Sequence, residues 1–429
     1  EGGRFDLAIA IGLLAASGQL PDEAVKGYEF VAELALSSEL RPCPAILSAA
    51  IACHASQRTM VVAPANATEA MMPQASRVIA PSHLNQLSQW LHQPEKQQQP
   101  EPPQAEAKLV PAADLVDVRG QEQAKRALII AAAGNHNLLM CGPPGTGKTM
   151  LASRLAGILP PLSNTEAMQV ASIHSVAGKG LREDIWSRPF RAPHHTASAA
   201  ALVGGGGTPK PGEISLAHQG VLFLDELPEF SRSVLEVLRE PLESGQILIS
   251  RVAAQTSYPA NFQLVAAMNP CPCGYLGSKR CTCSLDQISR YQHKISGPLL
   301  DRIDLQVQVS AIENQQLLDQ DRKVEGDSNQ QIQLRVCKAR DVQVQRQGKI
   351  NTYLTSQELN QVCPLNSELK ALLDQAIDRF GLSTRGFYRV LKVARTLADL
   401  ADISHPQLPQ YQEALSYRST IDKRTEIKS

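Results

Sequence analysis

The sequence predicts an α/β protein in which a parallel β-sheet is followed by a region made of helices. Between residues 109 and 310, short apolar runs suited to buried strands alternate with longer segments suited to helices, the pattern of a parallel sheet. The runs are LLM (138–140), VLFLDE (221–226) and FQLVAAMN (262–269). From residue 311 onward the chain carries helical patterns such as ELKALLDQAIDRF and FYRVLKVARTLADL.

Composition excludes several classes of protein. The 429 residues suffice for about two to four domains, and 43% hydrophobic with 20% charged residues is ordinary for a globular protein. The formal net charge is zero, so any contact with nucleic acid must come from a local basic cluster. No apolar run reaches the roughly 18 residues of a membrane span, and we expect no membrane association.

The first 91 residues are expected to form a separate domain. Residues 5–16 (FDLAIAIGLLAA) and 43–53 (CPAILSAAIAC) predict buried helices, and residues 58–64 (RTMVVAP) predict a buried strand. The start of the chain has no basic segment followed by a cleavage site, so we predict no signal peptide. It also has no initiator Met, and we expect this domain to begin before Glu1.

A linker is predicted at residues 92–108, HQPEKQQQPEPPQAEAK. This stretch is rich in Pro, Gln and Glu and has no apolar stripe. The expected organisation is therefore a domain at 1–91, a linker at 92–108, an α/β core at 109–310 and a helical domain at 311–429.

A phosphate-binding loop is predicted at residues 142–149, GPPGTGKT, which matches G-x-x-x-x-G-K-[ST] between a strand and a helix. Lys148 is expected to reach the β- and γ-phosphates of ATP, and Thr149 to place its hydroxyl on Mg²⁺. A glycine-rich turn with a chance lysine is the alternative, and the flanking elements disfavour it. The residues expected to contact the nucleotide are Gly142, Pro143, Pro144, Gly145, Thr146, Gly147, Lys148 and Thr149.

Polar side chains follow the next two apolar runs. VLFLDE ends in Asp225, a predicted Mg²⁺ ligand through water, and Glu226, a predicted general base for the attacking water. FQLVAAMN ends in Asn269, whose amide could orient that water. Each strand end could instead be an ordinary turn. The order along the chain, with a complete phosphate-binding loop first, then the two acids and then the asparagine, favours a catalytic role.

Two arginines are candidates to contact the γ-phosphate. Arg302 lies between two aspartates, as a surface ion pair would, but a ring ATPase presents an arginine from this place to its neighbour's nucleotide. Arg385 begins a helix in GLSTRGFYRVLKVARTLADL (381–400) and would place a second cation over the nucleotide. Arg389, one turn later, is the alternative.

Four cysteines lie within thirteen residues: Cys271, Cys273, Cys281 and Cys283. Four thiolates suit tetrahedral Zn²⁺, and Gly274 and Gly277 would bend the loop between the two pairs. The commoner zinc spacing is Cys-x-x-Cys, so free thiols stay open as an alternative, and so does an iron–sulfur cluster. Clustered cysteines also fit a reducing cytoplasm better than a disulfide scaffold.

Taken together, these segments resemble the ComM/YifB family of magnesium-chelatase-like AAA+ ATPases. RPFRAPHHTAS (188–198), GGGGTPKPGEISLAHQGVLFLDELPEF (204–230) and the cysteine segment carry the resemblance. It implies an AAA+ sheet with a C-terminal helical lid, preceded by a truncated Lon-protease-like (ribosomal S5 domain 2-like) α+β domain. That domain has no serine before Ser17, which disfavours proteolysis.

The resemblance also implies a hexameric DNA helicase or translocase that promotes branch migration in homologous recombination during natural transformation. Its implied partners are single-stranded and branched DNA, other copies of the chain in a homo-hexamer, and recombination proteins. A subunit that drives magnesium insertion into a tetrapyrrole and a regulator switched by ATP are the alternatives, and DNA stimulation of ATP hydrolysis would separate them from the first.

The resemblance also implies where the chain would contact DNA. Related ring ATPases carry an insert at this place in the chain, between the phosphate-binding loop and the strand that ends in two acids, and it forms a hairpin aimed at the central pore. The segment 173–213 is locally basic, and glycines 204–207 suit a flexible hairpin tip. A second hairpin is expected at 250–262. The candidate DNA contacts are Arg188, Arg191, Lys210 and Arg251. Solvated surface loops are the alternative, with His194 and His195 bracing the insert.

Overall fold

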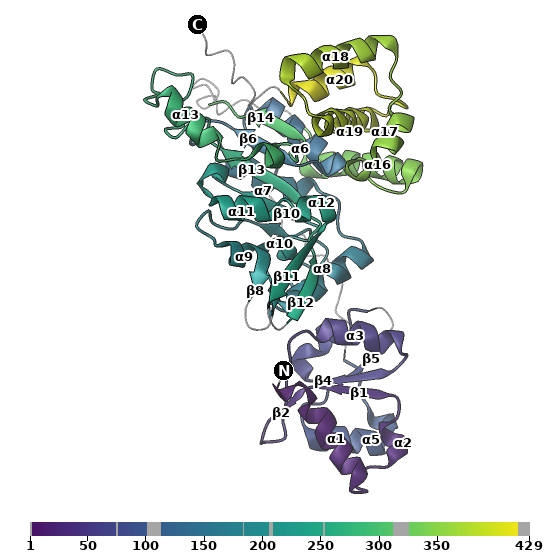
Figure 1. Ribbon diagram of the computed structural model, residues 1–429. Coiled ribbons are helices and arrows are strands. Elements are labelled where there is room, and N and C mark those ends of the chain that lie inside the picture. The colour runs from purple at the N-terminus through teal and green to yellow at the C-terminus, as the bar shows by residue number, and fades with distance from the viewer. Residues whose placement is uncertain are drawn as a thin grey trace. The chain divides into compact units, whose positions relative to one another are not determined.

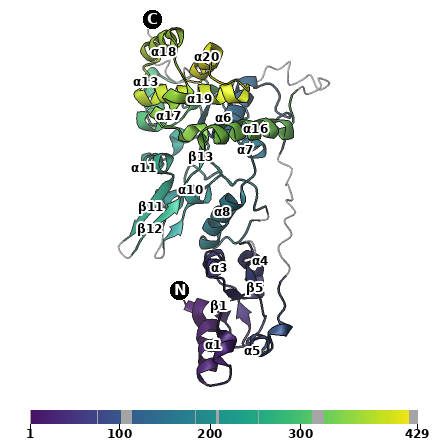
Figure 2. The same ribbon diagram turned by 90° about the vertical axis from the view of Figure 1, so that its right-hand side faces the viewer.

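The computed structural model describes residues 2–73, 76–100, 113–182, 184–205, 209–251, 254–311 and 326–418, apart from the side chains of Ser250, Arg251 and Ala254 (Figure 1, Figure 2). The chain forms two compact units. The first comprises Glu1–Leu109 and Leu162–Trp186, and the second comprises Val110–Pro161 and Ser187–Ser429. No helix among the described residues has both the length and the apolar character needed to cross a bilayer.

The first unit is built on a three-stranded parallel sheet in the order β1-β4-β5. Alternate residues of β4 enter two apolar clusters, because successive side chains of a strand point to opposite faces. Val61 packs with α1 and α5, whereas Met60 and Val62 pack with α3. The strands are β1 (Tyr28–Val31), β2 (Glu33–Leu34), β3 (Leu40–Arg41), β4 (Thr59–Val62) and β5 (Arg77–Ile79). The helices are η1 (Gly2–Phe5), α1 (Asp6–Ala16), α2 (Asp22–Val25), α3 (Ile46–Ala55), η2 (Pro64–Asn66), α4 (Ala67–Ala70), α5 (Leu84–His92) and η3 (Pro94–Lys96).

The prediction of a buried helix at residues 5–16 is right about the helix and wrong about its burial. α1 buries Leu7 and Ile11 on the sheet, while Phe5, Ile9 and Leu13 are 60–67% exposed on its other side. A helix that is apolar all round was expected to be enclosed, but a helix packed on one sheet face buries only one stripe. The predicted strand at 58–64 is β4.

A helix from the middle of the chain belongs to the first unit. α8 (Asn164–Val176) packs on α3, and the buried Glu69 accepts hydrogen bonds from the backbone N–H of Leu47 at 3.1 Å and from the Ser175 hydroxyl. The order of the elements along the chain does not predict that α8 packs in the first unit.

The predicted linker at 92–108 contacts the first unit near its start, where the Gln97 side chain donates to the Tyr28 hydroxyl at 2.8 Å. The predicted domain boundaries at 91, 108 and 310 stay predictions.

The second unit is built on a five-stranded sheet in the order β14-β6-β13-β10-β7, in which every neighbouring pair is parallel. The predicted runs form β6, β10 and β13, whose residues are all buried. One face packs on α6 and α7, and the other packs on α10 and α11. The strands are β6 (Leu138–Cys141), β7 (Phe190–Arg191), β10 (Val221–Leu224), β13 (Gln263–Met268) and β14 (Leu305–Gln308).

Short elements and two hairpins connect these strands. β8 pairs with β9, and β11 pairs with β12; the second hairpin starts four residues before the predicted 250–262. The bounds are α6 (Glu122–Gly134), α7 (Lys148–Ile158), α9 (Ala199–Val203), β8 (Gly204–Gly205), β9 (Lys210–Pro211), α10 (Glu213–Leu216), η4 (Leu227–Glu229), α11 (Arg232–Val237), α12 (Pro241–Ser244), β11 (Gln246–Arg251), β12 (Ala254–Pro259), α13 (Leu285–Gln292) and α14 (Gly297–Leu300).

The described chain beyond residue 326 is helical, which confirms the fold class of an α/β sheet with a helical C-terminal region. The helices are α16 (Asn329–Gln347), η5 (Asn351–Tyr353), α17 (Ser356–Val362), α18 (Ser367–Phe380), α19 (Thr384–Leu400) and α20 (Leu408–Ser416). A buried contact ties α19 to the loop after α6, where His136 Nε2 lies 2.8 Å from Thr396 Oγ1. Burial lowers the pKa of His136 to about 4, so this imidazole is neutral near pH 7.

Candidate active site

The loop between β6 and α7 has glycines where the backbone demands them. A Cβ atom on Gly142 would lie 2.1 Å from the carbonyl oxygen of Val309, so the end of β14 leaves no room for a side chain. Gly145 and Gly147 have φ angles of +78° and +85°, a region that favours glycine. The loop therefore turns its backbone toward the N-terminus of α7, where N–H groups can bind phosphate.

Lys148 is held inside this loop. Its side chain is 8% exposed, and Nζ donates to the carbonyls of Gly142 at 2.7 Å and Pro143 at 2.8 Å and to Asn269 Oδ1 at 3.2 Å. Burial lowers the pKa of Lys148, and the nearby Asp225 carboxylate acts in the opposite direction. The amine is thus held within the phosphate-binding loop, and its contact with phosphate stays a prediction.

The two acidic residues after β10 take different roles in the geometry. Asp225 Oδ2 accepts a hydrogen bond from the Thr149 hydroxyl at 2.6 Å, so the two predicted Mg²⁺ ligands touch each other. These oxygen donors fit Mg²⁺, and Thr149 and Asp225 would hold the ion, which would supply positive charge near the phosphates of a bound nucleotide. Glu226 has a φ angle of +52°, a strained conformation for a residue with a side chain. Such strain concentrates at functional sites and agrees with a catalytic carboxylate here.

Strand register brings these groups to one edge of the sheet. Cys141 pairs with Met268, so the phosphate-binding loop and Asn269 start at the same level. A cavity of about 410 Å³ opens at this edge. It is lined by Pro144, Gly145, Thr146, Gly147, Lys148, Thr149, Met150, Asp225, Glu226, Met268 and Asn269. Of the predicted nucleotide contacts, Gly142 and Pro143 lie behind this lining.

His195 is a site residue that sequence reasoning placed elsewhere. Its Nδ1 lies 3.1 Å from Glu226 Oε2, whereas the neighbouring His194 Nδ1 lies 2.8 Å from the Thr196 hydroxyl. β7 pairs with β10 and so delivers the segment after Arg191 to the edge where Glu226 lies. Because β7 has only two residues, it has no recognisable strand pattern, and no local signal predicts this contact.

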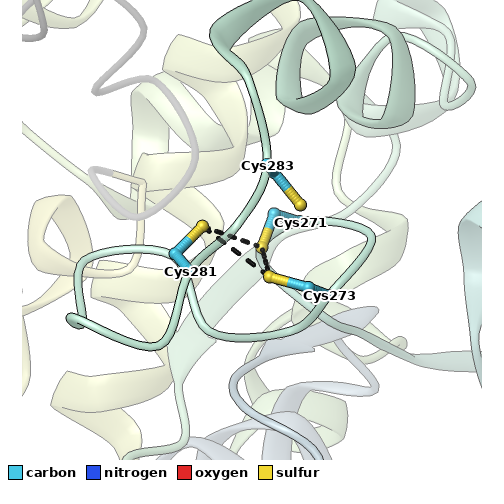
Figure 3. Close-up of side chains that lie close together, drawn as sticks. All are labelled: Cys271, Cys273, Cys281 and Cys283. Atoms are coloured by element: carbon cyan, nitrogen blue, oxygen red, sulfur yellow. Dashed lines mark hydrogen bonds between the residues drawn. The ribbon is translucent and has the colours of Figure 1, made fainter.

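The four cysteines converge at the same edge of the sheet (Figure 3). Their sulfur atoms all lie within 4.8 Å of one another, and the Cys271 sulfur is 3.4 Å from Cys273 and 3.9 Å from Cys281. Sulfurs bound to Zn²⁺ at about 2.3 Å in a tetrahedron are separated by about 3.8 Å. A disulfide would need about 2.05 Å, and all nine cysteines, each of them in the described part of the chain, are free.

Backbone groups around the cluster also suit metal-bound thiolates. N–H groups of Tyr275 and Thr282 lower the pKa of Cys273 to about 6, while burial raises the pKa of Cys271 to about 12. N–H groups aimed at sulfur are the usual outer support of thiolate ligands. Gly274 and Gly277, each with φ +84°, bend the loop as predicted. The donor set therefore fits Zn²⁺.

Comparison with known proteins covers nearly the whole chain. "Magnesium chelatase, subunit ChlI" matches residues 114–317, its C-terminal family matches 326–418, and "Subunit ChlI of Mg-chelatase" matches 1–66. The chain is 48% identical to the competence protein ComM of Haemophilus influenzae, over 98% of this chain and 83% of that protein. It is 47% identical to YifB of Escherichia coli, over 99% and 83%.

The chain belongs to the ComM/YifB family of magnesium-chelatase-like AAA+ ATPases. Membership supports an ATPase that uses ATP and Mg²⁺. The 38 kDa magnesium-chelatase subunit of Cereibacter sphaeroides is more distant, 27% identical over 169 residues, which is 35% of this chain and 51% of that protein. The ComM/YifB relatives thus match the chain much further than the chelatase subunit does.

The two arginines predicted to contact the γ-phosphate share one carboxylate in this ATPase. Arg302 is 4% exposed and donates to Glu243 and to the carbonyl of Pro298. Arg385 lies 3.1 Å from the same Glu243 oxygen. Neither arginine lines the cavity of the described residues. Arg389, the alternative to Arg385, instead pairs with the buried Asp304 and so ties α19 to the start of β14.

Some of the candidate DNA contacts are hydrogen-bonded within the protein, and others are exposed to solvent. Arg188 donates to the carbonyls of Pro160 and Gln219, each at 2.8 Å, and Arg191 makes two hydrogen bonds to Glu213. Lys210 is exposed on β9. The Arg251 side chain lies outside the described residues, although its backbone ends β11. The structure thus uses Arg188 and Arg191 internally and presents Lys210 to solvent.

Lys148 and Glu226 are expected to fail in different ways when they are changed. Lys148→Ala removes a buried amine from the phosphate site and should weaken ATP binding about 10- to 100-fold. Glu226→Gln keeps the shape of the side chain but removes the base, so binding should persist while hydrolysis falls at least about 100-fold. Equilibrium binding of a fluorescent ATP analogue and steady-state hydrolysis measure the two effects. Normal hydrolysis by Glu226→Gln would show that the base has been assigned wrongly.

Proposed function

We propose that this ATPase is a DNA helicase or translocase that works as a homo-hexamer and promotes branch migration in homologous recombination during natural transformation. The similarity to a protein named for competence supports this role. Single-stranded and branched DNA are the proposed partners, together with recombination proteins. The cytoplasm is the proposed location, because the chain's cysteines are free.

The observation that carries the proposal is the packing of the two predicted DNA-contacting hairpins against each other. The Tyr258 hydroxyl of β12 donates to the carbonyl of Pro209 at 2.9 Å. Ile249 of β11 reaches the backbone of Gly204, because a Cβ atom there would lie 2.9 Å from Ile249 Cδ1. Lys210 therefore belongs to the same surface as the hairpin that carries Arg251. One surface made of two hairpins suits contact with phosphates without reading of bases.

A chelatase subunit and a regulator switched by ATP are the competing functions. The family descriptions support a chelatase subunit, but the 38 kDa magnesium-chelatase subunit matches only 35% of this chain. Stimulation of ATP hydrolysis by DNA separates a motor from both alternatives. A branched-DNA unwinding assay then tests branch migration itself.

Lys210→Glu should weaken DNA binding without removing basal ATP hydrolysis. Reversing a charge that contacts phosphate should lower affinity about tenfold at low salt for all sequences and reduce the salt slope by about 1. Fluorescence anisotropy with single-stranded and forked DNA at several salt concentrations measures both. Lys370→Glu, at an exposed lysine of α18, is the matched control. Equal DNA affinity of the two variants would remove the β8–β9 hairpin from the DNA surface.

The hexamer requires that one subunit complete its neighbour's site, and we propose Arg302 for that role. Because Arg302 is buried against Glu243, it must leave this carboxylate before it can reach another nucleotide. Arg385 contacts the same oxygen atom, so both cations would be released together. Because the Arg302 side chain is itself buried, its separation from Glu243 costs more than that of an exposed ion pair, and the phosphate of the neighbouring nucleotide must replace the carboxylate as its partner.

Arg302→Ala should bind ATP normally yet lose about 10³-fold in hydrolysis, as expected for an arginine that stabilises transferred charge. Mixed with Lys148→Ala subunits, it should recover part of the activity at interfaces where an intact Lys148 faces an intact Arg302. Native mass spectrometry of the mixed rings and thermal melting of each variant are the controls. Mixed rings with no recovered activity would contradict a shared site.

We further propose that the four cysteines hold a structural Zn²⁺. A bound Zn²⁺ would act as a cross-link between the two Cys-x-Cys pairs, with no redox chemistry of its own. The spacing of the sulfurs and the N–H groups directed at Cys273 support this assignment over free thiols.

Protein prepared untagged and without chelator should contain about one zinc per chain by elemental analysis. Cys271→Ser should lose the metal and melt at a lower temperature, because one of four ligands is replaced. Cys337→Ser, which changes a half-buried cysteine of α16 outside the cluster, should keep the metal. If the unaltered protein contains neither zinc nor iron, the metal site is refuted and the four cysteines are packed thiols.

A further inference from the structure

The loop that carries the four cysteines also contacts the phosphate-binding loop. Gly274 directly follows Cys273, and a Cβ atom added to it would lie 2.5 Å from Cδ and 3.1 Å from Cγ of Pro144. The Pro144 ring therefore lies against the bare Cα of Gly274, with no room for a side chain between them. Because Pro144 lines the nucleotide cavity, this contact connects the cysteine loop to the wall of that cavity.

The position of Gly274 is set by the first cysteine pair. Its backbone N–H donates to the carbonyl of Cys271 at 3.0 Å, which closes a tight turn over Cys271 and Cys273. The φ angle of +84° at Gly274 directs the chain back toward the second pair. A metal ion held by the sulfurs of Cys271 and Cys273 would therefore also hold the turn that carries Gly274.

The same segment contacts the nucleotide site at its other end. Asn269 accepts a hydrogen bond from Lys148, and the fully buried Cys271 follows two residues later. Between them, the carbonyl of Pro270 accepts a hydrogen bond from Gln292 of α13 at 3.1 Å. The segment from Asn269 to Gly274 thus meets the phosphate-binding loop at the Lys148 amine and at the Pro144 ring, with the first cysteine pair between these two points.

We propose that metal at the four cysteines and nucleotide at the phosphate-binding loop bind cooperatively, through the contact between Gly274 and Pro144. The inference rests on the proposed metal site. Gly274 acts as a positioning residue: it supports the phosphate-binding loop in the shape that receives phosphate and takes no part in the chemistry. Loss of the metal frees the turn, and Pro144 loses its support.

Coupling between two sites is reciprocal, so each ligand raises the affinity of the other by the same factor. Bound nucleotide fixes Pro144 and, through it, the turn over Cys271 and Cys273. The metal should therefore leave more slowly when nucleotide is bound. This consequence concerns metal retention and is independent of ATP hydrolysis.

Gly274→Ala tests the contact, and Gly277→Ala is its matched control. Both glycines have φ +84°, so alanine pays the same backbone strain at each position. An added Cβ meets Pro144 at Gly274 but meets nothing within 4 Å at Gly277. Gly274→Ala should keep one metal per chain yet bind a fluorescent ADP analogue about tenfold more weakly than Gly277→Ala. Equal nucleotide affinities would overturn the proposal.

Metal release completes the test. Transfer of zinc to a chromogenic chelator is measured in the unaltered protein with and without ADP, and ADP should slow it; in Gly274→Ala that protection should disappear. Replacing Pro144 with Ala in the Gly274→Ala background removes the overlapping ring atoms and should restore part of the lost nucleotide affinity. If the unaltered protein holds no metal, the metal site itself is refuted. If it holds one metal and ADP leaves its release unchanged, the coupling alone is refuted.

Discussion

Everything at the candidate active site depends on the register of three parallel strands. β6, β13 and β10 pair so that Cys141 lies beside Met268 and Ala266 lies beside Leu224. The carboxyl ends of the strands therefore reach one edge, and each chain leaves the sheet there with its polar residue already in place. A shift of one residue in any pair would turn its polar end group to the other face of the sheet. The fully buried apolar strands fix this register, because both faces must pack.

The site also places charges where water is scarce, and each charge is compensated locally. Lys148 is surrounded by carbonyl oxygens and the Asn269 amide, which replace the water it loses. Asp304 is buried as well; burial acts to raise its pKa, but Arg389 and His136 outweigh that effect and lower it. The Arg389–Asp304 pair joins α19 to the start of β14.

Three residues predicted to take part in catalysis make ion-pair contacts with other side chains. Glu243 contacts both the exposed Arg385 and the buried Arg302, and water can replace the carboxylate easily only at Arg385. His195 touches Glu226, the predicted base, which is itself in a strained backbone conformation.

Features of the protein that have a local signal could be predicted from the amino-acid sequence. The phosphate-binding loop, the Asp225–Glu226 pair, Asn269 and the four cysteines each occupy a short stretch, and backbone geometry requires those residue types at that spacing. The buried parallel strands could also be predicted, because a short uninterrupted apolar run is typical of a strand that is covered on both faces. The contacts between residues far apart in the chain became known from the folded structure: His195 with Glu226, Glu243 with Arg302 and Arg385, Gly274 with Pro144, and α8 with the first unit. Such contacts depend on how whole elements pack, and no local periodicity records the partner on another element.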